Sequence, residues 1–130
     1  MAQHEPTRIV DERYALEAKL GEGGMGAVYR AHHLMTGAKV ALKLLHPHVA
    51  AIPGVAERFQ AEARAPAAIG HPGIVKVTDA GVTREGELYL VMELLEGDTL
   101  RALVARGPIP LAAIAPLVAD ALAALGAAHA

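Results

Sequence analysis

The sequence predicts an α+β fold, in which a five-stranded antiparallel sheet with one helix is followed by two further helices. Three observations lead to this prediction. In the segment 14–20, apolar residues recur at every second position, the period of a half-buried strand. From residue 55 the apolar spacing changes to that of a helix. The last twenty residues are rich in alanine, which favours a long final helix.

Five apolar segments separated by turn signals define the expected strands. The first runs into a glycine-rich stretch, and Thr36-Gly37 marks the turn before the third. The strands are expected at 14–20, 27–33, 39–45, 74–78 and 88–92. Because short turns join the first three strands, these should pair in antiparallel.

The helix that begins at Val55 is expected to bury one face. Val55, Phe59, Glu62, Pro66 and Ile69 follow one another in steps of four and three, which places them on one side of the helix. His71-Pro72-Gly73 should end it. The other expected elements are a connection at 47–54, a short helix at about 100–105, a turn at 107–110 and a helix from about 111 to the end.

These elements divide the chain into three expected parts. Residues 1–11 are polar and should form a flexible arm. Residues 12–95 contain all the expected strands and the first helix, and residues 96–130 contain the later helices.

Composition excludes several classes of protein. A chain of 130 residues with 53% hydrophobic residues has enough apolar material for a core. The net charge of −2 gives no general attraction to nucleic acid or to an anionic membrane. Disulfides are excluded by the lack of cysteine. The apolar run 111–119 contains a proline and ends at Asp120, short of the roughly 20 residues of a membrane span. No membrane segment and a soluble, cytoplasmic chain are therefore expected.

Glycines at 21, 23 and 26 form the most informative stretch of the chain. Backbone without Cβ atoms can approach a phosphate closely. A dinucleotide site would need a helix after the third glycine and an acidic residue about twenty positions later, and neither is present. A P-loop would need Lys-Ser or Lys-Thr after the last glycine, where Ala27-Val28 stands. A glycine-rich hairpin that covers phosphates remains.

Lys43 and Glu62 are the two charged residues that patterning places toward apolar surroundings. Lys43 ends the apolar run Val40-Ala41-Leu42, and Glu62 shares a helix face with Phe59. Either residue can instead be an ordinary solvated side chain. If they pair at about 4 Å, the attraction of roughly 4 kcal/mol is similar to the cost of desolvating the two ions. Such a pair makes more sense as a positioned cation for nucleotide phosphates than as a source of stability.

Taken together, these motifs resemble a bacterial serine/threonine protein kinase of the eukaryotic-like type, from about Tyr14 to His129. The resemblance rests on five segments in order: Gly21-Glu22-Gly23-Gly24-Met25-Gly26-Ala27-Val28-Tyr29-Arg30-Ala31, Val40-Ala41-Leu42-Lys43, Phe59-Gln60-Ala61-Glu62, His71-Pro72-Gly73-Ile74-Val75 and Leu90-Val91-Met92-Glu93-Leu94. It implies that residues 12–95 form the ATP-binding N-lobe and 96–130 the hinge exit and first helices of a C-lobe.

The resemblance also implies a role for each matching residue. Lys43 and Glu62 are expected as catalytic residues, with Lys43 on the α and β phosphates of ATP and Glu62 holding Lys43. The other expected ATP contacts are the loop residues Gly21, Glu22, Gly23, Gly24, Met25 and Gly26, the adenine roof Leu20, Val28 and Ala41, the gatekeeper Met92, the hinge residues Glu93 and Leu95, and Thr99 near the ribose. Val28, Ala41 and Met92 can equally be ordinary core.

The chain departs from the family pattern in two ways. The catalytic loop His-Arg-Asp and the Asp-Phe-Gly metal ligand do not occur in it, and Asp79-Ala80-Gly81 precedes the hinge instead of following it. The Mg²⁺ ligands are thus absent, no other metal site is expected, and a protein substrate is expected only for a complete domain. Pro66 removes the helical amide partner of the Glu62 carbonyl and can kink the helix.

These departures leave alternatives open. The chain is expected to be the ATP-binding part of a serine/threonine kinase, cut short before the catalytic loop and inactive by itself. It can also be a non-catalytic nucleotide-binding or kinase-interacting regulatory module, or a degenerate kinase fragment.

Overall fold

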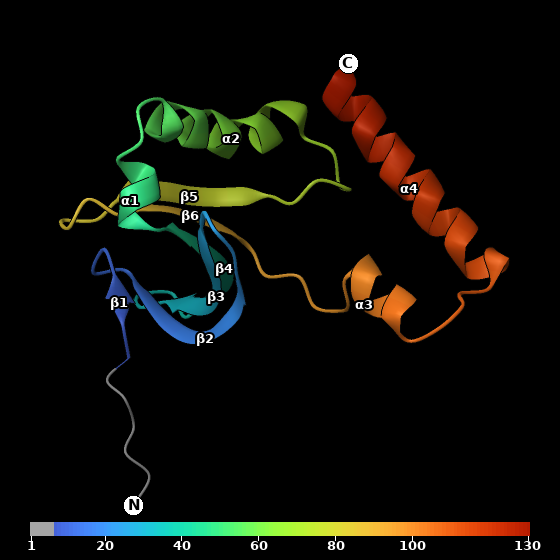
Figure 1. Cartoon of the computed structure of the whole chain (residues 1–130), viewed down its shortest axis with the longest axis horizontal. Helices are drawn as coiled ribbons and strands as arrows, with labels where there is room; N and C mark the ends of the chain where they lie inside the picture. The colour runs from blue at the N-terminus through green and yellow to red at the C-terminus, as the bar shows by residue number, and fades with distance from the viewer. Residues whose placement is uncertain (1–6) are drawn as a thin grey trace, which may run out of the picture.

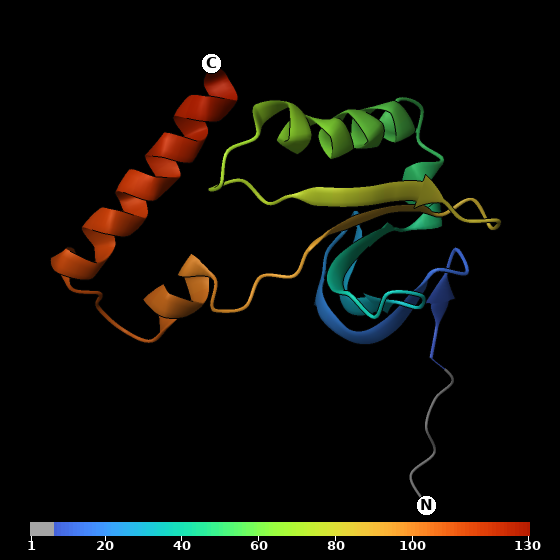
Figure 2. The same ribbon diagram turned by 180° about the vertical axis from the view of Figure 1, so that it is seen from behind.

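The computed structural model describes residues 7–130 and contains one strongly curved antiparallel sheet and four helices. The strands are β1 Ile9–Val10, β2 Tyr14–Glu22, β3 Gly26–His33, β4 Lys39–Leu45, β5 Val77–Val82 and β6 Leu88–Glu93, in the order β1-β2-β3-β4-β6-β5. The helices are α1 Pro47–Ala50, α2 Val55–Ile69, α3 Leu100–Ala105 and α4 Leu111–His129. Helix α2 lies along β5 and β6, whereas α3 and α4 lie to one side of the sheet (Figures 1 and 2).

The sheet has six strands instead of the expected five. The additional strand, β1, falls in the expected flexible arm, of which residues 1–6 lie outside the described residues. Ile9 pairs with Ala15 and Val10 with Tyr14, and Val10 is only 1% exposed. Since a two-residue strand is too short to show a period, the sequence pattern did not indicate it.

Two other boundaries differ from the sequence prediction. The sequence predicts a strand at 74–78, but β5 begins at Val77, because the turn after α2 continues to Ile74, whose N–H donates to the His71 carbonyl at 3.0 Å. The expected connection 47–54 contains the short helix α1. Its first residue is Pro47, a position where a missing N–H costs nothing.

The core consists of two apolar clusters on opposite faces of the sheet. Leu42 and Leu44 of β4 belong to the first cluster, whereas Leu45 belongs to the second together with Phe59 of α2. Burial of a side chain such as Phe59 contributes about 2–3 kcal/mol. Because side chains alternate along a strand, Lys43 points to the face that α2 covers.

Helix α2 packs on the sheet through Val55 and Phe59 of the predicted face, but Glu62 is not part of the buried side. Val55, Ala56, Phe59 and Ala63 pack into the second cluster, while Glu62 is exposed. Glu62 and Ala63, three and four residues after Phe59, can both lie on the same side of the helix as Phe59. In the structure the apolar Ala63 faces the sheet. The prediction that Glu62 points inward is therefore wrong. Helix α2 continues through Pro66 and ends at Ile69, where Gly70, with a φ of 63°, caps it.

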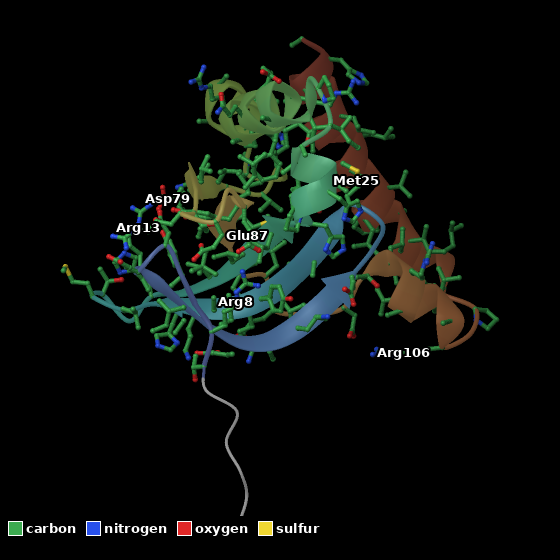
Figure 3. All side chains as sticks on the ribbon, turned by 60° about the vertical axis from the view of Figure 1, so that its left-hand side comes forward. Arg8, Arg13, Met25, Asp79, Glu87 and Arg106 are labelled. Carbon is green, nitrogen blue, oxygen red and sulfur yellow. The ribbon has the colours of Figure 1, made fainter. Side chains whose placement is uncertain are left out.

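Curvature brings the two ends of the strand order together. β1 and β5 are opposite edges of the sheet, yet side chains around β1 contact side chains of β5 and the β5–β6 hairpin (Figure 3). The contacts are an Arg8–Glu87 ion pair, a hydrogen bond from the Tyr14 hydroxyl to Asp79 at 2.7 Å, an Arg13–Asp79 ion pair at 3.0 Å and a hydrogen bond from the Tyr89 hydroxyl to Asp11 at 2.5 Å. Asp79 of Asp79-Ala80-Gly81 thus has a structural role.

Both tyrosines of this cluster are shielded from water. Burial and the hydrogen bond to Asp11 raise the pKa of Tyr89 to about 12. The hydrogen bond from Arg13 has the opposite, weaker effect and lowers this pKa. Burial and the hydrogen bond to Asp79 raise the pKa of Tyr14 above its ordinary value. The neutral hydroxyl forms therefore belong to the folded state.

The two C-terminal helices agree with the predicted bounds. Thr99 caps α3, because its hydroxyl oxygen accepts the Ala102 N–H at 3.0 Å. Helix α4 has no buried residue. It has 19 residues, and an 18-residue stretch of it has a mean hydropathy of 1.9, so it is long and apolar enough to cross a membrane, judged by length and composition alone. This differs from the expectation of no membrane segment, because the alanines after Asp120 extend the apolar stretch.

Candidate functional site

The β2–β3 hairpin carries the glycine-rich loop, residues 21–26. Its tip is closed by a hydrogen bond from Gly23 N–H to the Gly26 carbonyl at 2.9 Å. A Cβ added to Gly21, Gly23 or Gly24 would meet nothing within 4 Å, so these positions leave open space for a ligand. Gly26 differs, because its added Cβ would lie 2.1 Å from the Leu44 carbonyl oxygen. Packing against β4 therefore requires glycine at position 26.

Lys43 lies opposite this hairpin. In the β3–β4 ladder Val28 pairs with Lys43, which places the two side chains on the same face. A cavity of about 310 Å³ is lined by residues of the glycine-rich loop together with Val28 and Lys43. The half-buried lysine is the only cation in this lining. The cavity thus combines a positive charge with the Cβ-free backbone of the loop glycines, and Glu22 is also part of the lining.

A larger cavity of about 700 Å³ lies elsewhere, between the end of α2 and the end of β6, with Gly70, His71, Lys76 and Glu93 in its lining. It contains neither Lys43 nor any residue of the glycine-rich loop. The Glu93 side chain is engaged there, since its carboxylate accepts the Lys76 N–H at 3.0 Å. We place the candidate site at the smaller cavity because it brings Lys43 together with the glycine-rich loop.

The residues predicted to surround an adenine lie on β3, β4 and β6 and on the segments that flank them. Ala41 pairs directly with Met92 in the β4–β6 ladder, so both lie on the face that carries Lys43. Leu20 lies at an irregularity in the β2–β3 ladder and is 53% exposed. Leu95, beyond β6, is 64% exposed. The exposed apolar side chains leave this edge of the site open to water.

Residues 14–130 match the family model described as the protein kinase domain. The chain belongs to the protein kinase family. It is 43% identical to the serine/threonine-protein kinase Pkn1 of Myxococcus xanthus over 90% of this chain and 17% of that protein, and 41% identical to PknB of Mycobacterium leprae over 92% of this chain and 20% of that protein. The crystal structure of the PknI kinase domain of Mycobacterium tuberculosis is similar, with a TM-score of 0.75, 30% identity, and coverage of 98% of this chain and 53% of that domain.

The kinase fold places the matched residues in the N-terminal portion of the domain. This chain spans 17–20% of the length of the two relatives named above and about half of the solved kinase domain. The resemblance deduced from the sequence motifs, to bacterial serine/threonine kinases of the eukaryotic-like type, is confirmed. The kinase fold class is confirmed as well, with the sixth strand as the difference.

Lys43 and Glu62 do not meet in this kinase lobe. Within residues 7–130 no ion pair joins them, and Glu62 is exposed on α2. In protein kinases this ion pair accompanies the arrangement that supports phosphoryl transfer. In this structure the two side chains are not paired.

Two contacts of the glycine-rich loop were missed by sequence reasoning. Lys19 donates to Glu22 at 2.9 Å, and its ammonium lowers the pKa of that carboxyl. His46, the residue after β4, contacts Gly23 and Met25. Its position directly after the strand of Lys43 is the only signal in the sequence that could have drawn attention to it.

Proposed function

We propose that this chain is the ATP-binding part of a bacterial serine/threonine protein kinase, with the N-lobe at 12–95 and the hinge exit and first C-lobe helices at 96–130. The observation that carries the proposal is the cavity in which Lys43 faces a loop of Cβ-free glycines. An ammonium group beside free backbone amides is a suitable arrangement for the charged oxygens of a polyphosphate.

In this proposal the loop residues Gly21, Glu22, Gly23, Gly24, Met25 and Gly26 cover the phosphates. Lys43 binds the α and β phosphates, and the apolar side chains of Leu20, Val28, Ala41 and Met92 contact the adenine ring. The backbone at Glu93 and Leu95 supplies the polar contacts to the adenine edge. Thr99 keeps its O–H free to donate to a ribose, because only its oxygen is used in the cap.

Phosphoryl transfer is proposed for the kinase of which these residues are the ATP-binding part, with a protein serine or threonine hydroxyl as acceptor. The catalytic loop and the Mg²⁺ ligands do not occur among the 130 residues. The described residues, 7–130, also contain no cluster of acidic or histidine side chains that could hold a metal ion. We infer that the chain alone binds ATP without transferring its γ-phosphate.

The exposed apolar face of α4 fits the same proposal. The family match extends to residue 130, so α4 lies within the kinase domain. We infer that its apolar side chains pack against further kinase-domain residues instead of lipid. Since ATP is an intracellular ligand, we place this lobe in the cytoplasm.

The test is calorimetric titration of ATP into the 130-residue chain and into Lys43→Met. Loss of a charge-assisted contact should weaken ATP binding by about 10- to 100-fold. Glu62→Gln is the matched control, because Glu62 is exposed and unpaired with Lys43; its affinity should stay within about twofold of the parent chain. Equal affinities of the parent chain and Lys43→Met would refute the phosphate role of Lys43.

A parent chain that binds no ATP at all would overturn the ATP-binding proposal as a whole. The remaining hypothesis would then be a kinase-interacting module that binds no nucleotide.

A further inference from the structure

His46 connects the end of β4 to the tip of the glycine-rich loop by two hydrogen bonds. Its backbone N–H donates to the Met25 carbonyl at 3.0 Å. Its ring Nε2 lies 3.2 Å from the Gly23 carbonyl oxygen. Because a carbonyl oxygen can only accept, the ring nitrogen must carry the proton and donate. Figure 3 shows Met25 at the loop tip beside α1, the helix that His46 precedes.

The ring of His46 also has an aromatic neighbour. The imidazole of His48 stacks on it, with 5.5 Å between the ring centroids and 11° between the planes. His48 makes no contact with the loop among the hydrogen bonds of the described chain. The stack thus restricts the rotation of the His46 side chain without touching the loop itself.

The contact with Gly23 determines the direction of the next amide. In a trans peptide the C=O and the following N–H point in opposite directions. The Gly23 carbonyl is turned to His46, so the Gly24 N–H is turned away from it. Within residues 7–130 that N–H has no hydrogen-bond partner. A free amide in a loop with open space around it is available to an anion.

We propose that His46 is a positioning residue that holds the glycine-rich loop with the Gly24 amide directed at a bound phosphate. The inference rests on the proposed ATP-binding function and assigns His46 a role that the kinase motifs do not include. The residue acts through the loop and does not itself touch the nucleotide.

The hydrogen bond does not depend on the charge of the ring. The neutral Nε2–H tautomer and the imidazolium both donate from Nε2. The charged or titratable groups around His46 are the Glu22 carboxylate, which its charge helps to stabilise, and the stacked His48. Glu22 is in turn engaged with Lys19. The contact should therefore persist over the whole neutral pH range.

The experiment compares His46→Phe, His46→Gln and His48→Phe in the full 130-residue chain. Phe keeps an aromatic ring for the stack but removes the donor, whereas the Gln side-chain amide can donate in place of Nε2. The first measurement, made without nucleotide, is hydrogen exchange of the Gly23 amide, whose N–H donates to the Gly26 carbonyl at the loop tip. Exchange should become about two- to tenfold faster in His46→Phe, the fold-change that corresponds to one lost neutral hydrogen bond, and should return toward the parent rate in His46→Gln.

The second measurement compares the affinities for ATP and for adenosine. His46→Phe should weaken ATP binding by about two- to tenfold and leave adenosine binding unchanged, because the loop acts only on phosphates. His48→Phe, the matched control, should change neither affinity. A general loss of folding would lower both affinities together, so the ratio separates it from a positioning effect.

Unchanged loop exchange in His46→Phe would overturn the proposal whatever the nucleotide data show. Faster exchange with an unchanged ratio of ATP to adenosine affinity would also overturn it, because the loop would then be held without consequence for phosphate. If the parent chain bound no ATP, the proposed function would fail first, while the exchange data would still report whether His46 holds the loop.

Discussion

Replacing Gly26 by alanine should destabilise the N-lobe without any reference to a ligand. Gly26 pairs with Leu45 in the β3–β4 ladder, and an added Cβ would lie 2.1 Å from the Leu44 carbonyl oxygen and 2.9 Å from the Leu45 Cα. Both are backbone atoms, so no side-chain rotation relieves the clash. The strands must separate locally, which combines overpacking with the loss of a ladder hydrogen bond and should cost about 2–4 kcal/mol.

The assay is thermal unfolding followed by far-ultraviolet circular dichroism. For a domain of this size, that loss should lower Tm by about 10–20 °C. Gly24→Ala is the matched control, because nothing lies within 4 Å of its added Cβ and its Tm should stay within about 4 °C of the parent chain. If Gly26→Ala had the same Tm as Gly24→Ala, the close approach of β3 to β4 would not exist in solution, and the packing explanation would be refuted.

Three further outcomes follow from the structure. Glu12 has a φ of 57° in the turn between β1 and β2, a conformation that glycine adopts without strain. Glu12→Gly should therefore raise the free energy of unfolding, measured in urea, by about 0.5–1 kcal/mol, whereas Glu12→Gln should leave it unchanged. A lower free energy of unfolding in Glu12→Gly would contradict this. Because the pKa of Tyr89 is raised to about 12, its contribution to stability is complete below the ordinary tyrosine pKa near 10 and is lost as the pH rises to 12. The fall in Tm with pH over this alkaline range should be shallower in Tyr89→Phe than in the parent chain. It should not vanish, because Tyr14 also contributes to it. An equally steep fall in both proteins would refute the role given to Tyr89. Limited digestion with trypsin should cut within residues 97–130 before it cuts the sheet, since neither α3 nor α4 has a buried residue. If this segment survived digestion as long as the sheet, it would be packed in solution and the prediction would be wrong.

Sequence reasoning succeeded where a local pattern carries enough residues. Helix α3 and the start of α2 were predicted at the observed residues, and α4 within one residue of its end, because each has a clear boundary signal or a long periodic run. Strand β1 and helix α1 were not predicted, since elements of two and four residues have no measurable period. The structure places the glycine-rich loop and Lys43 around one cavity, because β3, which leaves the loop, pairs along its length with β4.

The limit of pattern reasoning is clearest at Glu62. A helical spacing places it beside Phe59, but the same spacing also allows Ala63 to face the sheet. Only the packing of α2 on the second apolar cluster decides between the two rotations of the helix. The same limit applies to Gly26, which looks like the other loop glycines in the sequence and differs from them only in its distance from Leu44.

The sequence by itself determined the kinase family, the order of most elements, and the residue types gathered around the candidate phosphate site, because these depend on local spacing and on motifs. The tertiary structure decided the rest. It placed β1 against β2 and joined the two edges of the sheet through Tyr14, Tyr89 and their acidic partners, it turned Glu62 to solvent, and it brought His46 to the glycine-rich loop. Each of these depends on how residues distant in sequence compete for the same space, and no single stretch of the chain contains that information.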